Sequence, residues 1–71
     1  MKTRNIYTVE TIHDWSDIFP MTDVFSSKKA AIEIAKWNYN DGAQCVRVTQ
    51  HIKWGMTTMG KHEILRLEKQ N

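Results

Sequence analysis

The clearest pattern in this chain is an alternation of hydrophobic and polar positions over residues 45–54. A period of two residues is typical of a strand with one buried face and one exposed face. The apolar face consists of Val46, Val48, Ile52 and Trp54, and the polar face consists of Cys45, Arg47, Thr49, His51 and Lys53.

Two segments before this strand are also predicted to be extended. Residues 4–11 are rich in β-branched and aromatic side chains and lack Gly and Pro, and Tyr7 and Val9 share one face. After a turn, residues 18–25 return as a second strand. Because Pro20 has no N–H to donate, we expect this second strand at an edge of the sheet.

A hairpin is predicted at the C-terminal end of the chain. Gly55 and Gly60 frame a loop over residues 55–60, and residues 61–69 follow as a strand. In this strand Leu65 and Leu67 fall on one face, opposite Ile64 and Arg66.

One helix is predicted over about residues 27–40, because this segment lacks Gly and Pro and has helical periodicity. A hydroxyl from Ser26 or Ser27 can cap its first turn, and Gly42 can adopt the left-handed conformation that ends it. Two small side chains at the centre of the apolar stripe let the helix lie close to a sheet. The stripe consists of Ala31, Ile34, Ala35 and Asn38.

Together these elements predict a small α+β fold. One helix packs on one face of a mostly antiparallel sheet of three or four strands, in the order β-(β)-α-β-β. At 71 residues, we expect a single domain over residues 1–71. Tyr7, Trp37 and Trp54 are predicted to form its aromatic core, and Trp15, in the turn, is predicted to be exposed.

Charge is distributed unevenly along the chain, although the net charge is only +2. Residues 1–25 carry two bases and four acids, a net −2, whereas residues 26–71 carry eight bases and four acids, a net +4. A basic face is one feature of nucleic-acid-binding domains, so a nucleic-acid-binding module is one hypothesis. Its contacts would be Lys28, Lys29, Arg47, Lys53 and Arg66.

The residue types that would support catalysis are sparse. Cys45 and His51 would lie about 20 Å apart on a straight strand, at roughly 3.3 Å per residue. The sequence has one Cys, no Gly-rich phosphate loop and no convergent set of metal ligands. We therefore expect no enzyme, metal or cofactor. There is no apolar run near 18 residues and no signal-peptide pattern, so we expect a soluble cytoplasmic protein without a membrane partner.

Several short motifs resemble the small inhibitor of host RNA polymerase that T7-like podophages carry. The similarity covers roughly residues 6–49, and the last 20 residues have no counterpart in that family. The best shared feature is the helix pattern Ala-x-x-x-Ala-x-Trp-x-Tyr, formed here by Ala31, Ala35, Trp37 and Tyr39. A Gly and then Val46-Arg47-Val48 follow it, as in that family. Upstream, the family's first strand is matched by Tyr7-Thr8-Val9-Glu10, and Pro20 falls near its Pro in the second strand.

This resemblance implies a fold with one helix and three strands that docks on the jaw of the β′ subunit of bacterial RNA polymerase. Docking there blocks formation of the open promoter complex. Arg47 matches one strand arginine of the family, Thr49 falls where a second arginine stands, and Glu10 matches a residue of its acidic strip. The helix departs from the family, because lysines here replace acids.

The leading hypothesis is therefore a phage protein that binds and inhibits or modulates a host bacterial enzyme in the host cytoplasm. RNA polymerase is the first guess for that enzyme. Exposed aromatic rings beside Arg are typical of the side chains that dominate protein interfaces. The predicted partner contacts are Glu10, Trp15, Arg47, Thr49 and Lys53.

Overall fold

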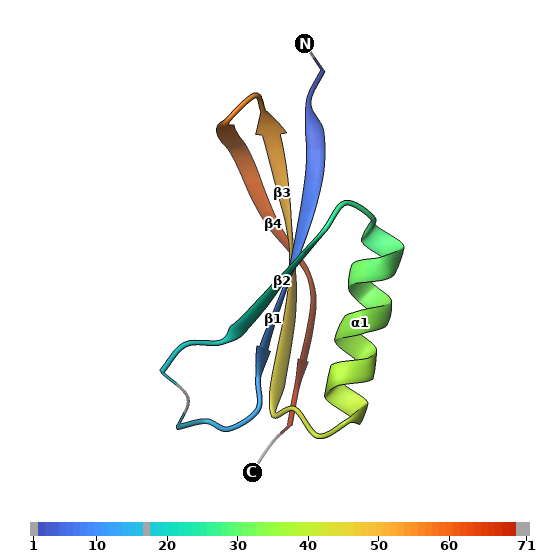
Figure 1. Ribbon diagram of the computed structural model, residues 1–71, viewed down its shortest axis with the longest axis vertical. Coiled ribbons are helices and arrows are strands. Elements are labelled where there is room, and N and C mark those ends of the chain that lie inside the picture. Colours follow the sequence, from blue (N-terminus) through green and yellow to red (C-terminus); the bar gives the residue numbers. More distant parts are fainter. Residues whose placement is uncertain (1, 17, 70–71) are drawn as a thin grey trace.

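The computed structural model describes residues 2–16 and 18–69 and contains one helix and four strands (Figure 1). The strands form one antiparallel sheet with the spatial order β2-β1-β3-β4. Helix α1 packs on one face of this sheet, as Figure 1 shows at the right of the view. The predicted α+β class and the predicted order of elements are therefore confirmed.

The two central strands are β1, Arg4–Ile12, and β3, Cys45–Trp54. They pair along their whole length, so that Val9 lies opposite Val48. Val9, Val46 and Val48 are completely buried. The alternation predicted for both strands is confirmed, because buried Tyr7 and Val9 on β1 face α1 together with Val46 and Val48 on β3. The other face carries mostly polar side chains, although Ile6 and Ile12 also lie there.

Helix α1 spans Lys28–Asn40, and the Ser27 hydroxyl caps it by accepting a hydrogen bond from the Ala30 N–H. Ala31 and Ala35 are completely buried. Because these side chains end at Cβ, they let the helix backbone approach the sheet closely. After the helix, Gly42 has a φ of 118°, which disfavours any residue with a Cβ.

The core beneath the helix is small and contains only one of the aromatic rings predicted for it. Tyr7 is buried, but Trp37 is 70% exposed and Trp54 is 44% exposed, so that prediction is wrong for both tryptophans. The physical reason for Trp37 is its position two residues after Ala35, which turns it about 200° away from the buried stripe of a 3.6-residue helix. Trp15 is exposed, as predicted.

A hydrogen bond joins the helix to the sheet inside this small core. Thr11 is buried on β1, and the Asn38 amide of α1 donates to its hydroxyl oxygen at 3.1 Å. This contact satisfies the one polar side chain that the core holds among the described residues. It also fixes the position of the last helical turn against the end of β1.

Strand β2, Met21–Phe25, is shorter than the predicted 18–25 but lies at the sheet edge as predicted. It pairs with β1 from Tyr7 opposite Phe25 to Thr11 opposite Met21. The segment before it, with Pro20, forms the connection from β1 instead of a strand. The predicted turn lies in this connection, and one of its positions, residue 17, is outside the described residues.

Strand β4, Thr57–Glu68, forms the other edge, and its start corrects the predicted loop. Only Gly55 and Met56 connect β3 to β4, because Gly55 has a φ of 59° and allows a tight turn. Two irregularities in the pairing then take up the extra residues. One of them includes Ile64, which packs against the core instead of facing away from Leu65.

Candidate functional site

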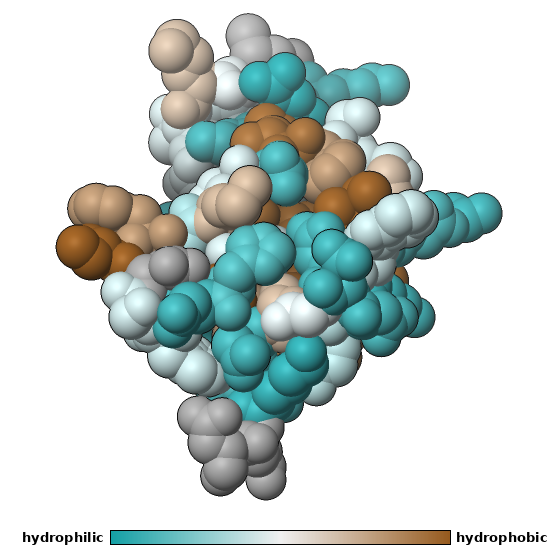
Figure 2. Space-filling model, turned by 60° about the horizontal axis from the view of Figure 1, so that its bottom comes forward, coloured by the Kyte–Doolittle hydropathy of each residue, from teal (hydrophilic) through white to brown (hydrophobic). Residues whose placement is uncertain are grey.

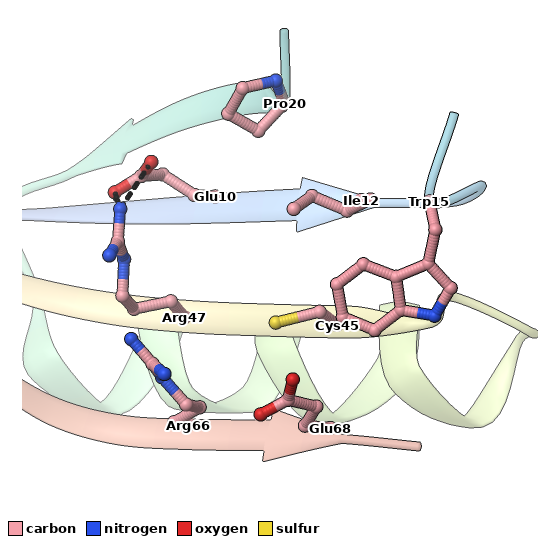
Figure 3. Close-up of a pocket in the computed structure, with 8 residues that line it drawn as sticks. All are labelled: Glu10, Ile12, Trp15, Pro20, Cys45, Arg47, Arg66 and Glu68. Atoms are coloured by element: carbon pink, nitrogen blue, oxygen red, sulfur yellow. Dashed lines mark hydrogen bonds and ion pairs between the residues drawn. The ribbon is translucent and has the colours of Figure 1, made fainter. Parts of the chain in front are cut away.

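The face of the sheet opposite α1 carries most of the predicted site residues, and we call it the open face. Figure 3 shows its side chains in front of the strands, with the helix behind them. In an antiparallel sheet, paired residues point to the same side, so the register defines this face. It consists of Arg4, Ile6, Thr8, Glu10 and Ile12 on β1, Thr22 and Val24 on β2, Cys45, Arg47, Thr49, His51 and Lys53 on β3, and Thr58, Lys61, Glu63, Arg66 and Glu68 on β4.

A bidentate ion pair lies at the centre of the open face. Arg47 Nη2 donates to both Glu10 carboxylate oxygens at 2.8 Å, and Arg47 Nε donates to Oε1 at 3.2 Å. The two residues are cross-strand partners on β3 and β1, so the sheet itself brings them together. This forked geometry holds the guanidinium in a defined orientation.

A second arginine lies next to this pair on β4. Arg66 is the cross-strand partner of Arg47, and like charges in that arrangement repel each other. Each guanidinium has its own carboxylate, because Arg66 Nε donates to Glu63 Oε1 at 2.8 Å. The face therefore presents alternating acids and bases instead of one uniform charge.

A pocket of about 380 Å³ opens beside the Arg47–Glu10 pair (Figure 3). The Trp15 ring closes one end of it, and Pro20 stands above β1 at one side. Its remaining walls come from β1, β3 and β4, with Ile12, Cys45, Arg66 and Glu68. The pocket thus combines an aromatic ring, aliphatic walls and two arginines.

Cys45 lies in this pocket but is poorly suited to act as a nucleophile. Burial raises the pKa of its thiol, and the negative charge of Glu68 raises it further. Since the thiolate is the reactive form, a raised pKa lowers reactivity at neutral pH. Among residues 2–16 and 18–69, no three His, Cys, Asp or Glu side chains are close enough to hold a metal ion.

A smaller pocket of about 270 Å³ lies at the other end of the open face, where Ile6, Thr8, Val24, His51 and Lys53 line it. A hydrogen bond of 2.9 Å joins Thr8 Oγ1 to His51 Nε2. Burial lowers the pKa of His51, and the nearby charges of Lys61 and Lys53 lower it further. The imidazole is therefore held towards its neutral form.

The structure brings together three of the five predicted partner contacts. Glu10, Arg47 and Trp15 line the larger pocket, although Trp15 comes from a connection and not from a strand. Thr49 and Lys53 share the open face with them but lie further along β3. The Lys53 ammonium donates to the Thr58 hydroxyl at 2.7 Å.

The five predicted nucleic-acid contacts do not form one surface. Lys28 and Lys29 lie at the start of α1, on the opposite side of the sheet from Arg47 and Lys53. Both arginines of the set are also paired with carboxylates. A strand of nucleic acid lying on the open face would meet acids between the bases, which weakens this hypothesis.

No protein-family model, curated protein or solved structure matches this chain. In the described part of the chain, α1 is too short and too polar to cross a membrane.

Sequence reasoning missed the largest exposed apolar side chains near the pocket. Ile18 and Phe19 were assigned to a strand, but they lie in the connection between β1 and β2. The available signal was Pro20, which interrupts strand pairing one residue after Phe19. Figure 2 shows a hydrophobic projection on the side of the molecule where Figure 1 places this connection.

Proposed function

We propose that this protein binds another protein through the open face and thereby inhibits or modulates it. The observation that carries the proposal is the convergence of Glu10, Arg47 and Trp15 on one pocket of an uncovered sheet face. From the resemblance of its helix and first strands, the proposed partner is bacterial RNA polymerase, bound at its β′ subunit in the host cytoplasm so that transcription initiation is blocked.

The chemistry of the pocket supports contact with a protein. Tryptophan and arginine are the side chains most enriched among residues that dominate binding energy. Glu10 occupies Arg47 Nε and Nη2, and within the described residues Arg47 Nη1 makes no hydrogen bond. This nitrogen can therefore donate to a carboxylate or carbonyl oxygen of a partner without breaking the existing ion pair.

The first test is the substitution Arg47→Ala, with affinity for purified bacterial RNA polymerase measured by biolayer interferometry. We expect at least a tenfold loss of affinity, because the guanidinium is oriented for contact. The melting temperature should change little, since the Arg47 side chain is 40% exposed and such pairs contribute at most about 1 kcal/mol.

The matched control is Lys36→Ala, on exposed helix surface away from the open face. This variant should bind and inhibit initiation like the unchanged protein. If Arg47→Ala lowers the melting temperature strongly but still binds the polymerase with unchanged affinity, Arg47 is not a contact residue. If the unchanged protein does not bind the polymerase, the partner is wrong, and binding of DNA or RNA at low ionic strength would favour the nucleic-acid hypothesis instead.

A further inference from the structure

The connection between β1 and β2 carries an apolar surface that the fold leaves uncovered. We call Trp15, Ile18 and Phe19 the apolar tip. Ile18 is 85% exposed and Phe19 is 83% exposed, and Trp15 is exposed as well. The connection projects from the side of the sheet away from α1 (Figures 1 and 2), so no described element packs on it.

The apolar tip continues directly into the larger pocket of the open face. Trp15 belongs to both, and Pro20, between Phe19 and Met21, lines the pocket. A partner that fills the pocket would therefore reach the tip without a gap. Contiguous apolar surface of this kind marks interaction sites on small proteins, because it gains free energy when water leaves it.

The charge around the apolar tip indicates which occupant it fits. The described residues 11–16 and 18–27 contain no Lys or Arg but two acids, Asp14 and Asp23. Arg4 is at the far end of β1, about 26 Å away at roughly 3.3 Å per residue. Arg47 and Arg66 line the adjoining pocket, but Glu10 and Glu63 pair with them, and Glu68 adds a further acid there. The surroundings of the tip are thus acidic.

Acidic surroundings favour one class of partner over the others. They repel the phosphates of nucleic acids and of anionic membranes, and they repel the same tip on a second copy of the chain. We propose that the apolar tip is an anchor that inserts into an apolar groove with a basic rim on the partner protein. This inference rests on the proposed function, because it specifies the chemistry of that partner.

The experiment replaces Phe19 with the photo-crosslinker p-benzoylphenylalanine and irradiates the full chain in living bacteria. We expect an adduct with a different protein, whose cross-linked peptide is apolar and flanked by Lys or Arg. The matched control places the crosslinker at Met56, which is fully exposed and lies in the turn at the opposite end of the sheet. The control should not give this adduct.

Three outcomes would overturn the anchor: no adduct, an adduct with a second copy, and an adduct with lipid or nucleic acid. An acidic cross-linked peptide would overturn the basic rim. The result also separates the two proposals. An adduct with a protein other than RNA polymerase supports the anchor only if its cross-linked peptide is apolar and flanked by Lys or Arg, and it then rejects that enzyme as the partner. Polymerase binding without an adduct rejects the anchor alone.

The affinity of the cross-linked protein then tests the two parts of the inference separately. Phe19→Ser should weaken binding at least tenfold and Met56→Ser should not, with unchanged circular dichroism because both side chains are exposed. Asp14→Lys should weaken binding severalfold, since Asp14 is exposed next to Trp15 of the tip. Stronger binding by Asp14→Lys would show that the rim is acidic.

Discussion

The hydrogen bond between Thr8 and His51 shows how a single titrating side chain on the open face affects stability. Burial, Lys61 and Lys53 lower the pKa of His51 below its ordinary value of 6.5. The unfolded chain therefore takes up a proton at a higher pH than the folded chain does. By linkage, the contribution of His51 to stability is complete above the unfolded pKa and declines as the pH falls below it.

We predict that the free energy of unfolding falls between pH 7 and pH 5 more steeply for the unchanged protein than for His51→Gln. Glutamine can still hydrogen-bond to Thr8 but does not titrate. Urea denaturation at several pH values measures both curves. Parallel curves across this range would show that His51 does not contribute to the pH dependence.

At the same scale, the identities of the site residues could be predicted from the sequence, but their pairing could not. The alternation of β3 placed Arg47 on the exposed face, and Glu10 was singled out by resemblance alone. Arg47 and Glu10 form a bidentate pair because of the register between β1 and β3. This register follows from the whole sheet and not from either segment alone. The contribution of Trp15 to the pocket depends in the same way on how its connection folds back.

The elements themselves are stabilised by features that can be tested locally, and the cap of α1 is the clearest. Ser27 accepts the Ala30 N–H at 3.3 Å, whereas Ser26 lies outside the helix and is exposed. We predict that Ser27→Ala lowers the free energy of unfolding by about 1 kcal/mol, the usual effect of losing an N-cap. Ser26→Ala is the matched control, and an equal loss in both, measured by urea denaturation, would contradict the capping role.

Elements with a regular period were predicted well, and irregular ones were not. β1, α1 and β3 follow periods of two and 3.6 residues, and their observed bounds agree with the prediction within a residue or two. β4 contains irregular pairing near Met59 and Ile64, which breaks the period and hid the start of the strand. Residues 18–20 look extended in sequence but have no strand to pair with, because Pro20 interrupts the edge.

In the whole molecule, β4 is an integral part of the sheet, although the family resemblance ends before it. It pairs with β3 from Cys45 to Trp54, and Leu65 packs against the core. Without β4, Val46 and Val48 would become exposed to solvent on one side. Because a core this small contributes only a small net free energy of folding, this loss of burial would be enough to unfold the chain.

We therefore predict that the chain truncated after residue 56 does not fold cooperatively. Its thermal unfolding, followed by circular dichroism, should lack the transition of the full chain, and the exposed β3 edge should promote aggregation. A truncated chain with a sharp transition would show that residues 6–49 form a stable body alone.

The sheet also separates two surfaces that face in opposite directions. The outer side of α1, with Lys36 and Trp37, has no atoms in common with the pocket around Arg47. Substitutions on the helix can thus accumulate without changing what the open face recognises, provided that the two buried alanines remain. A lineage could therefore reverse the charge of its helix while keeping the same partner, or exchange partners on one face while retaining the same scaffold.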